Sequence, residues 1–208
     1  MLRIGVLVSG GGTNLQAILD AIDTGTIPDA QVELVLSNKT QAFALQRAKT
    51  ASIPTAIVIR KNFGSGPEYD HALYAKLEEH QIDLVLLAGF MSILGPDFFT
   101  HLKNRVMNVH PALIPAFSGP GYYGLRVHEA VLETGCKVTG ASVHFVTPEV
   151  DAGPIILQRA VAVQRGDTPE ILQKRVMEEA EWKIYPEAVK LFAQGRLQIN
   201  EHHVIIKD

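Results

Sequence analysis

The sequence is poor in cysteine: Cys136 is the only thiol among 208 residues. A single thiol excludes an internal disulfide framework and a zinc site built from several thiolates. No apolar run is long enough to span a bilayer, and residues 1–8 lack the small-residue cleavage site of a signal peptide. These absences predict a reducing, cytoplasmic setting and no membrane contact.

The sequence also lacks a strong excess of either charge. There are 19 Lys and Arg against 22 Asp and Glu, a net charge of −3, which argues against binding to nucleic acid. Hydrophobic residues make up 47% and charged residues 20%, an ordinary globular composition. Because no repeat, linker or low-complexity stretch interrupts the chain, we expect one domain over residues 1–208.

The first half alternates short β-rich runs with helical spacing of apolar residues. We expect strands at 4–8, 32–36, 55–59 and 84–88, and helices over 15–22, 43–51 and 69–77. A loop is expected at 62–67. The run at 84–88 has no polar residue, which is typical of a central strand covered on both faces. This rhythm predicts an α/β fold: a doubly wound, mostly parallel central sheet with helices on both faces.

The second half begins with a strand at 104–110 and a loop over 110–123 that is rich in turn formers. Long loops inside compact domains are often functional. Strands are expected at 138–146 and 155–163. Thr168, Pro169 and Glu170 form a helix start, and the helix is expected to reach residue 193 with a break at Pro186. Residues 196–206 are expected to form a closing hairpin.

A glycine-rich turn, SGGGTN at residues 9–14, joins the first expected strand to the first helix. Glycines let the backbone approach a ligand closely, and free N–H groups at a helix start suit a phosphate. No Gly-Lys-Ser/Thr follows, so the turn is not a Walker A loop. The third dinucleotide-fingerprint position is Leu15, so a phosphate on a smaller molecule fits better than NAD. A flexible connection without a ligand is the alternative.

Three polar residues of the second half are candidates for proton chemistry. Asn108 and His110 face the same side of a strand, where an amide can donate to an oxyanion and an imidazole can move protons. Asp151 lies in a turn and could orient His110 or a water. A capped strand end and a simple turn aspartate are the structural alternatives. His144 could equally be a core histidine. No His, Asp and Glu cluster has metal-ligand spacing, so no metal is expected.

The motifs SGGGTNLQ (9–16), LAGFM (87–91), NVHPALIP (108–115), VHFV (143–146) and DAGP (151–154) occur in this order. Together they make the chain resemble the phosphoribosylglycinamide formyltransferase family, folate-dependent enzymes of purine synthesis, over nearly its whole length. The resemblance implies the Rossmann-like formyltransferase fold. It also implies small-molecule substrates and no nucleic-acid partner; the oligomeric state stays open.

The resemblance implies a role for each matching residue. Asn108, His110 and Asp151 match the family's catalytic trio. The nucleotide substrate, glycinamide ribonucleotide, would contact Gly12, Thr13, Asn14 and Glu181. The pterin of 10-formyltetrahydrofolate, a cosubstrate, would lie against Met91, Ser92, Ile93 and Leu94, with Asn108 also in contact. On this basis the N-terminal half would bind the nucleotide phosphate, and the C-terminal half would bind folate and carry the catalysis.

The sequence departs from the family pattern at several places. Ser92 and Gly66 stand where the family usually has arginines, and Lys61 is the nearest cation upstream of Gly66. Ala112 replaces the Ser that follows His-Pro in the family. The segment GYYG at 121–124 resembles an insertion of a bacterial branch. These changes concern contacts with the folate tail rather than the chemistry.

The implied reaction is formyl transfer from 10-formyltetrahydrofolate to the glycinamide amine. Asn108 and a protonated His110 would stabilise the oxyanion, and Asp151 would raise the His110 pKa. Three alternatives remain. Formyltetrahydrofolate deformylase uses the same trio but usually has an extra N-terminal domain and lacks the glycine-rich turn. Methionyl-tRNA formyltransferase carries an added C-terminal RNA-binding domain. A non-catalytic nucleotide- or folate-binding module would have no use for the trio.

Overall fold

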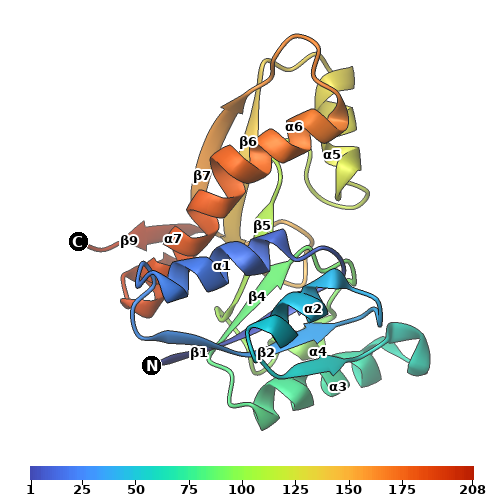
Figure 1. Cartoon of the computed structure of the whole chain (residues 1–208), viewed down its shortest axis with the longest axis vertical. Coiled ribbons are helices and arrows are strands. Elements are labelled where there is room, and N and C mark those ends of the chain that lie inside the picture. Colours follow the sequence, from blue (N-terminus) through green and yellow to red (C-terminus); the bar gives the residue numbers. More distant parts are fainter. The chain divides into compact units, whose positions relative to one another are not determined.

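The structure is a computed structural model that describes all of residues 1–208. The chain divides into two compact units, Met1–Met107 and Asn108–Asp208, which are described separately below. Figure 1 labels the helices and strands of each unit. No helix has both the length and the apolar character that a membrane span requires.

The first unit contains a parallel sheet whose strands follow the order β3-β2-β1-β4. Val6 in the middle of β1 pairs with Val35 on one side and Leu86 on the other, so β1 is a central strand. The strands are β1 (Leu2–Val8), β2 (Ala30–Ser37), β3 (Thr55–Ile57) and β4 (Leu84–Ala88).

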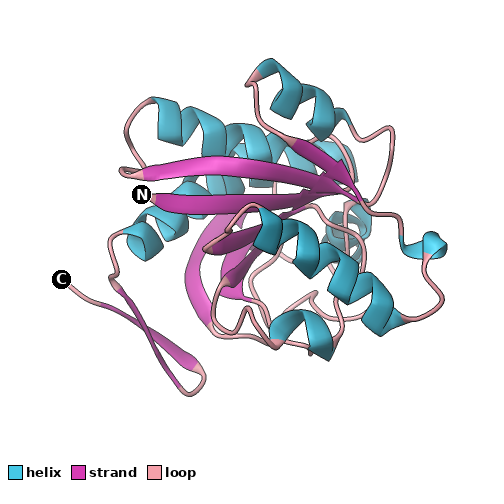
Figure 2. Ribbon diagram, turned by 90° about the horizontal axis from the view of Figure 1, so that it is seen from below, coloured by secondary structure: helices cyan, strands magenta, loops and turns pink.

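Helices lie on both sides of these strands (Figure 2). Their bounds are α1 (Thr13–Asp23), α2 (Phe43–Thr50), α3 (Gly66–Glu79) and α4 (Pro96–Phe99), with a 3₁₀ turn η1 (Arg60–Asn62). All five residues of β4 are buried, as expected for an apolar strand covered on both faces. Together with the parallel pairing, this confirms the predicted α/β class with a mostly parallel, doubly wound sheet.

The second unit begins at Asn108, within β5 (Val106–His110). Its strands follow the order β5-β6-β7-β9-β8. The long strands β6 (Val138–Phe145) and β7 (Ile155–Ala162) are antiparallel, whereas β7 and β9 (His203–Ile206) are parallel. β8 (Leu197–Asn200) and β9 form the expected C-terminal hairpin. Its helical elements are α5 (Leu125–Glu133), α6 (Pro169–Val176), a π-helical turn η2 (Met177–Glu181) and α7 (Trp182–Ala193).

Three details of the predicted secondary structure were wrong. The helix does not break at Pro186, because α7 continues through it with a buried apolar face, and the irregularity lies earlier, in η2. Helix α5 was not predicted: no element was assigned between the expected loop at 110–123 and the strand at 138–146, although Val127, His128 and Val131 give one buried helical face. The expected loop at 62–67 ends early, since Ser65 caps α3 by accepting a bond from the Glu68 amide.

Candidate active site

In the first unit, polar residues meet at the carboxyl ends of three parallel strands. The Ser9 hydroxyl, after β1, accepts a hydrogen bond of 2.8 Å from the amide of Met91, after β4. The Asn38 amide, after β2, donates to the Ser92 hydroxyl at 2.7 Å. This edge is where ligands bind in open α/β sheets. The glycine-rich turn and the segment after β4 therefore adjoin at this edge of the sheet.

The glycine-rich turn is held from one side by α2. The Gly10 carbonyl accepts from the Ala44 amide at 3.0 Å, and the Gly11 carbonyl accepts from Nε of Arg47 at 2.9 Å. In a trans peptide the carbonyl and the following N–H point in opposite directions. The N–H groups of Gly11 and Gly12 therefore point away from α2, at the start of α1. This arrangement suits an anion.

Gly12 is required for a different reason from the one the motif suggested. Its φ is +71°, and a Cβ there would lie 2.6 Å from the Ala44 Cβ. Gly12 thus permits the close packing of the turn on α2, whereas a Cβ on Gly10 or Gly11 would meet nothing within 4 Å. Thr13 and Asn14 open α1, and the side chain of Asn14 is largely buried.

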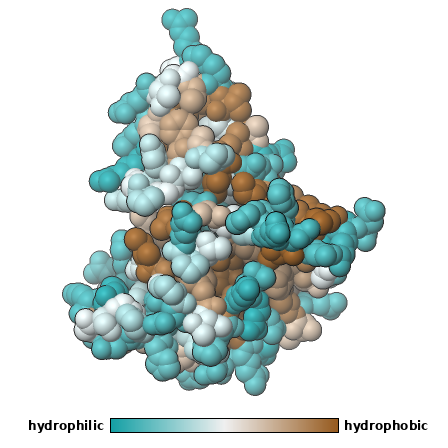
Figure 3. Space-filling view, turned by 180° about the vertical axis from the view of Figure 1, so that it is seen from behind, coloured by the Kyte–Doolittle hydropathy of each residue, from teal (hydrophilic) through white to brown (hydrophobic).

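The predicted folate segment after β4 combines exposed apolar and buried side chains. Met91 is 47% and Ile93 76% exposed, whereas Leu94 is buried in the core. The face drawn in Figure 3 shows apolar patches among mostly hydrophilic side chains. Exposed apolar side chains beside a polar strand edge suit a flat, largely apolar ligand. The whole segment lies in the first unit, and folate binding by the C-terminal half stays a prediction.

In the second unit, His110 at the end of β5 is held at both ring nitrogens and is almost fully buried. Nε2 lies 2.8 Å from the Phe117 carbonyl, and Nδ1 lies 3.5 Å from Oδ2 of Asp151. A carbonyl only accepts, so Nε2 carries a proton and donates it. In the neutral ring Nδ1 is then unprotonated and can take a proton beside a carboxylate.

Burial lowers the pKa of His110 below its ordinary value, and His144 adds to this lowering. The Asp151 carboxylate and the Phe117 carbonyl raise the pKa but do not fully offset burial. The predicted effect of Asp151 on the His110 pKa has the right sign, but in the ligand-free protein burial outweighs it. The neutral imidazole fits a proton acceptor.

Asp151 lies between β6 and β7 with a φ of +54°, and its side chain is 9% exposed. Its Oδ2 accepts a hydrogen bond of 2.9 Å from the Gly119 amide. Burial raises the pKa of Asp151, but His144, His110 and the Gly119 amide outweigh burial and hold the pKa below its ordinary value. The carboxylate of Asp151 therefore favours its charged form and faces His110.

Asn108 is oriented by His144, whose role the sequence left open. The Nδ1 of His144 lies 2.9 Å from the Phe145 carbonyl and donates to it, so in the neutral ring Nε2 is an acceptor. The Asn108 amide nitrogen lies 3.3 Å from this Nε2. The Asp151 carboxylate is farther from Nε2, at 3.6 Å. One N–H of Asn108 is thus used by His144, and its second N–H is available to a ligand.

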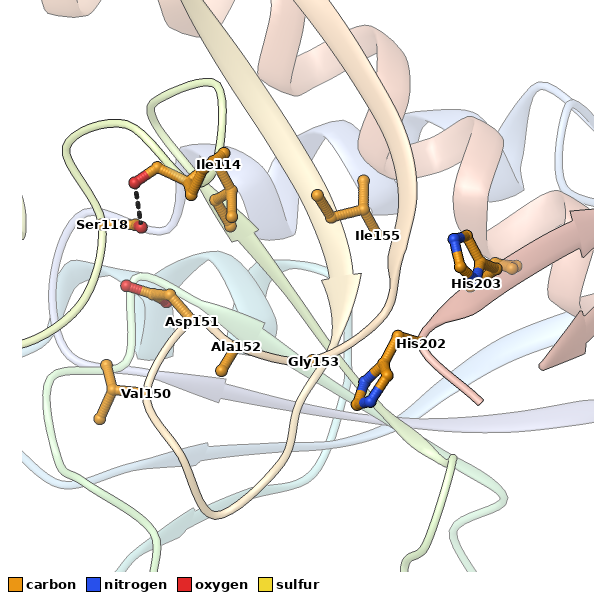
Figure 4. A pocket seen from close by; sticks show the side chains of 11 residues that line it. Ile114, Ser118, Val150, Asp151, Ala152, Gly153, Ile155, His202 and His203 are labelled. Atoms are coloured by element: carbon orange, nitrogen blue, oxygen red, sulfur yellow. Dashed lines mark hydrogen bonds between the residues drawn. The ribbon is translucent and has the colours of Figure 1, made fainter. Parts of the chain in front are cut away.

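A cavity of about 560 Å³ in the second unit borders this cluster. Asp151 lines it together with Ser118 and with His202 and His203 of the C-terminal hairpin. In Figure 4 the Asp151 carboxylate points toward the Ser118 segment and away from His202. Both hairpin histidines are exposed.

Two further polar side chains of the second unit, Glu181 and His128, are buried. Glu181 ends η2 with its side chain 6% exposed. His128 on α5, which the sequence did not single out, is fully buried, and neither ring nitrogen has a hydrogen-bond partner. Burial, followed by His110, lowers its pKa to about 4. In the sequence, His128 could have been recognised only by its place beside Val127 and near Val131, on the apolar face of a helix that was not predicted.

The two positions without family arginines differ in their surroundings. Gly66 begins α3, and a side chain there would enter open space. Ser92 accepts a hydrogen bond from Asn38, and the nearby phenol oxygen of buried Tyr69 has no hydrogen-bond partner. The guanidinium of Arg60 lies 5.8 Å from the centroid of the Tyr69 ring. No group of three or more His, Cys, Asp or Glu side chains could hold a metal ion.

The protein has an α/β fold, and its second unit brings Asn108, the buried His110 and Asp151 together in one cluster with His144. The profile of the Formyl transferase family matches residues 2–189, and the chain belongs to this family. The phosphoribosylglycinamide formyltransferase of Escherichia coli (strain K12) is 44% identical over 201 residues, which cover 97% of this chain and 92% of the relative.

A human relative, the trifunctional purine biosynthetic protein adenosine-3, is 45% identical over 200 residues, 96% of this chain. The chain spans only 19% of the length of that relative. Among solved structures, glycinamide ribonucleotide transformylase 1 from Symbiobacterium toebii superposes with a TM-score of 0.94 at 47% identity. That match covers 100% of this chain and 95% of the other.

Proposed function

We propose that this protein transfers the formyl group of 10-formyltetrahydrofolate to the amine of glycinamide ribonucleotide, giving the formylated nucleotide and tetrahydrofolate. The observation that carries the proposal is the arrangement of Asn108, His110 and Asp151, with one free amide N–H and one unprotonated ring nitrogen. Full-length relatives named phosphoribosylglycinamide formyltransferase, such as that of Escherichia coli, support the choice of substrates.

The reaction begins when the amine nitrogen attacks the formyl carbon. A new C–N bond forms and the carbonyl electron pair moves onto oxygen. The second N–H of Asn108, whose amide is held by His144, donates to this developing oxyanion. A donor that is already oriented needs no reorganisation as charge appears.

His110 moves the proton. Its Nδ1 accepts a proton from the attacking amine, while Nε2–H stays bonded to the Phe117 carbonyl. The Asp151 carboxylate, 3.5 Å from Nδ1, stabilises the imidazolium. When the intermediate collapses, the bond to the folate N10 breaks and N10 takes up this proton. The amine has then lost one proton and the leaving nitrogen has gained one.

Substrate binding follows from the first unit and from the family resemblance. The N–H groups of Gly11 and Gly12 suit the nucleotide phosphate, with Thr13, Asn14 and Glu181 as further contacts. Met91, Ser92 and Ile93 suit the pterin, and buried Leu94 supports that segment from the core. We place this activity in the cytoplasm, with small molecules as partners, in keeping with the single cysteine.

The test is an absorbance assay of tetrahydrofolate release with and without glycinamide ribonucleotide. Release that requires the nucleotide, with formylated nucleotide formed in equal amount, is the expected result. Release at the same rate without nucleotide would identify a deformylase. Binding of both ligands without release would identify a binding module. Release that depends on methionyl-tRNA in place of the nucleotide would identify the tRNA formyltransferase.

A further inference from the structure

The loop before α5 contacts both members of the His110 and Asp151 pair. The Phe117 carbonyl accepts the Nε2–H of His110 at 2.8 Å. Two residues later, the Gly119 amide donates to Oδ2 of Asp151 at 2.9 Å. One short stretch of backbone therefore fixes the proton on His110 and holds the carboxylate that faces it. Any movement of this stretch changes both interactions.

Phe117 holds this position in an unfavourable conformation. Its φ is +50°, in the left-handed region that bulky side chains rarely adopt. Such a conformation persists only where surrounding contacts determine it. The aromatic ring of Tyr122 supplies one such contact: the two ring centroids lie 6.1 Å apart at an interplanar angle of 74°. This is an edge-to-face pair. The Tyr122 amide also donates to the Gly119 carbonyl at 3.2 Å, which closes the turn.

We infer that Tyr122 is a positioning residue for His110: its ring packs on Phe117 and so fixes the backbone carbonyl that holds the imidazole. This inference rests on the proposed formyl transfer for its catalytic consequence, but the geometry exists in the free protein. It assigns a role to the GYYG segment at 121–124, whose two tyrosines are 39% and 44% exposed.

The neighbouring Tyr123 provides a matched control. It has the same side chain, is 44% exposed, and lies under the guanidinium of Arg126 at 5.0 Å from the ring centroid. No ring contact joins it to Phe117. A general loss of loop packing would follow from either substitution, whereas a role through Phe117 belongs to Tyr122 alone.

The experiment compares Tyr122→Ala, Tyr122→Phe and Tyr123→Ala with the unchanged protein. The first readout is the NMR titration of His110 in the ligand-free protein. The charged and titratable groups facing His110 are Asp151, His144 and His128, and none of them is altered. The Phe117 carbonyl raises the His110 pKa, so its displacement shifts the titration to lower pH. The second readout is kcat, which is expected to fall by a factor of about two to ten, the size of an aromatic-pair contribution.

Tyr122→Phe keeps the ring, so its His110 titration and kcat are expected to match those of the unchanged protein. Tyr123→Ala is expected to leave the His110 titration and kcat unchanged as well. An unchanged His110 titration in Tyr122→Ala, or the same shift in Tyr123→Ala, would overturn the inference. If Tyr122→Ala does not fold, Tyr122→Leu gives the same comparison with more bulk retained. A shifted titration in a protein that shows no nucleotide-dependent transfer would leave the positioning role intact and refute the proposed function.

Discussion

Nδ1 of His110 lies 3.5 Å from Oδ2 of Asp151, and both side chains are nearly inaccessible to solvent. Burial lowers the pKa of His110, and Asp151 is the largest influence that opposes burial. The carboxylate therefore decides how readily the imidazole takes a proton. In water a carboxylate at this distance would matter far less, because the solvent would screen it.

Asp151→Asn keeps the shape of the side chain and removes its charge. We expect the His110 pKa to fall further, because burial is then opposed only by the Phe117 carbonyl. Turnover is expected to fall by roughly a hundredfold or more, the scale of lost acid–base catalysis. NMR titration measures the His110 pKa, and the pH profile of kcat/KM measures its effect on turnover. An unchanged pKa with near-normal turnover would leave Asp151 as a turn residue only.

Asn108→Ala removes the amide that His144 orients. Because the second N–H meets the formyl oxygen only as charge develops, kcat is expected to fall by roughly a hundred- to a thousandfold. Folate affinity is expected to fall much less. Steady-state kinetics measure kcat, and folate titration measures the affinity. Asn62→Ala, at an exposed position, is the control. A fall confined to substrate affinity would indicate a ground-state contact.

Gly11 and Gly12 are expected to respond differently to substitution. Gly11→Val covers an N–H that points away from α2, and should weaken nucleotide binding roughly tenfold or more, the size of a lost hydrogen bond to a charged group. The thermal stability of the Gly11→Val variant should not change, since a Cβ at this position meets no atom within 4 Å. Gly12→Ala should lower stability, by about 1–2 kcal/mol from its left-handed φ alone, with a clash against Ala44 in addition.

Calorimetry with the nucleotide and thermal melting distinguish these outcomes. Loss of folate binding with normal nucleotide binding in Gly11→Val would mean that the two substrates are assigned to the wrong segments. Equal destabilisation by both substitutions would show that the turn serves packing alone.

The elements that follow a clear hydrophobic period were predictable from the sequence. The apolar run 84–88 coincides with β4, and the α1 and β6 predictions differ from the structure by at most two residues at each end. Helix α5 was not predictable in this way, because its nine residues lie between glycines and carry only three buried side chains. The continuation through Pro186 depends on the burial of residues on the face of α7, which is tertiary information.

The candidate site was predictable as residue types but not as geometry. Motif order pointed to Asn108, His110 and Asp151, yet no local pattern reveals that burial outweighs Asp151 at His110. The same holds for His144, which alternates in a strand like any core residue and gains a role only through its contacts with Asn108 and Asp151. Backbone partners such as the Phe117 carbonyl carry no sequence signal at all.

Gly66→Arg introduces the arginine that the family usually has at this position and tests its contribution to folate binding. The position begins α3 and has room for a side chain, and the family resemblance implies an arginine here that contacts the folate glutamate tail. We expect tighter binding of long-tailed folates, by about 1 kcal/mol or less because the contact is exposed. Affinities for folates of different tail length measure this, and Gly66→Gln is the uncharged control. Equal affinities across tail lengths in the parent and in Gly66→Arg would show that a side chain at this position does not contact the folate tail.

His128 makes the protein sensitive to acid. Its pKa in the folded state is about 4, while the unfolded chain has the ordinary value of 6.5. As the pH falls through 6.5, the unfolded chain therefore binds a proton that the folded protein does not. Stability is retained above this range, is lost progressively toward pH 4, and changes no further below it on account of this residue. The total amounts to about 3 kcal/mol.

His128→Leu removes this titration and also a buried ring whose nitrogens have no partner. We expect the free energy of unfolding at pH 7 to stay the same or rise, because an unpaired polar group no longer has to be desolvated. Between pH 6.5 and 4 the variant should lose less stability than the parent, with His110 accounting for part of the remaining loss. Urea unfolding at several pH values measures both slopes. The exposed His71→Gln is the control, and a parent and a His128→Leu variant with identical pH dependence would show that His128 is charged or hydrated in the folded protein.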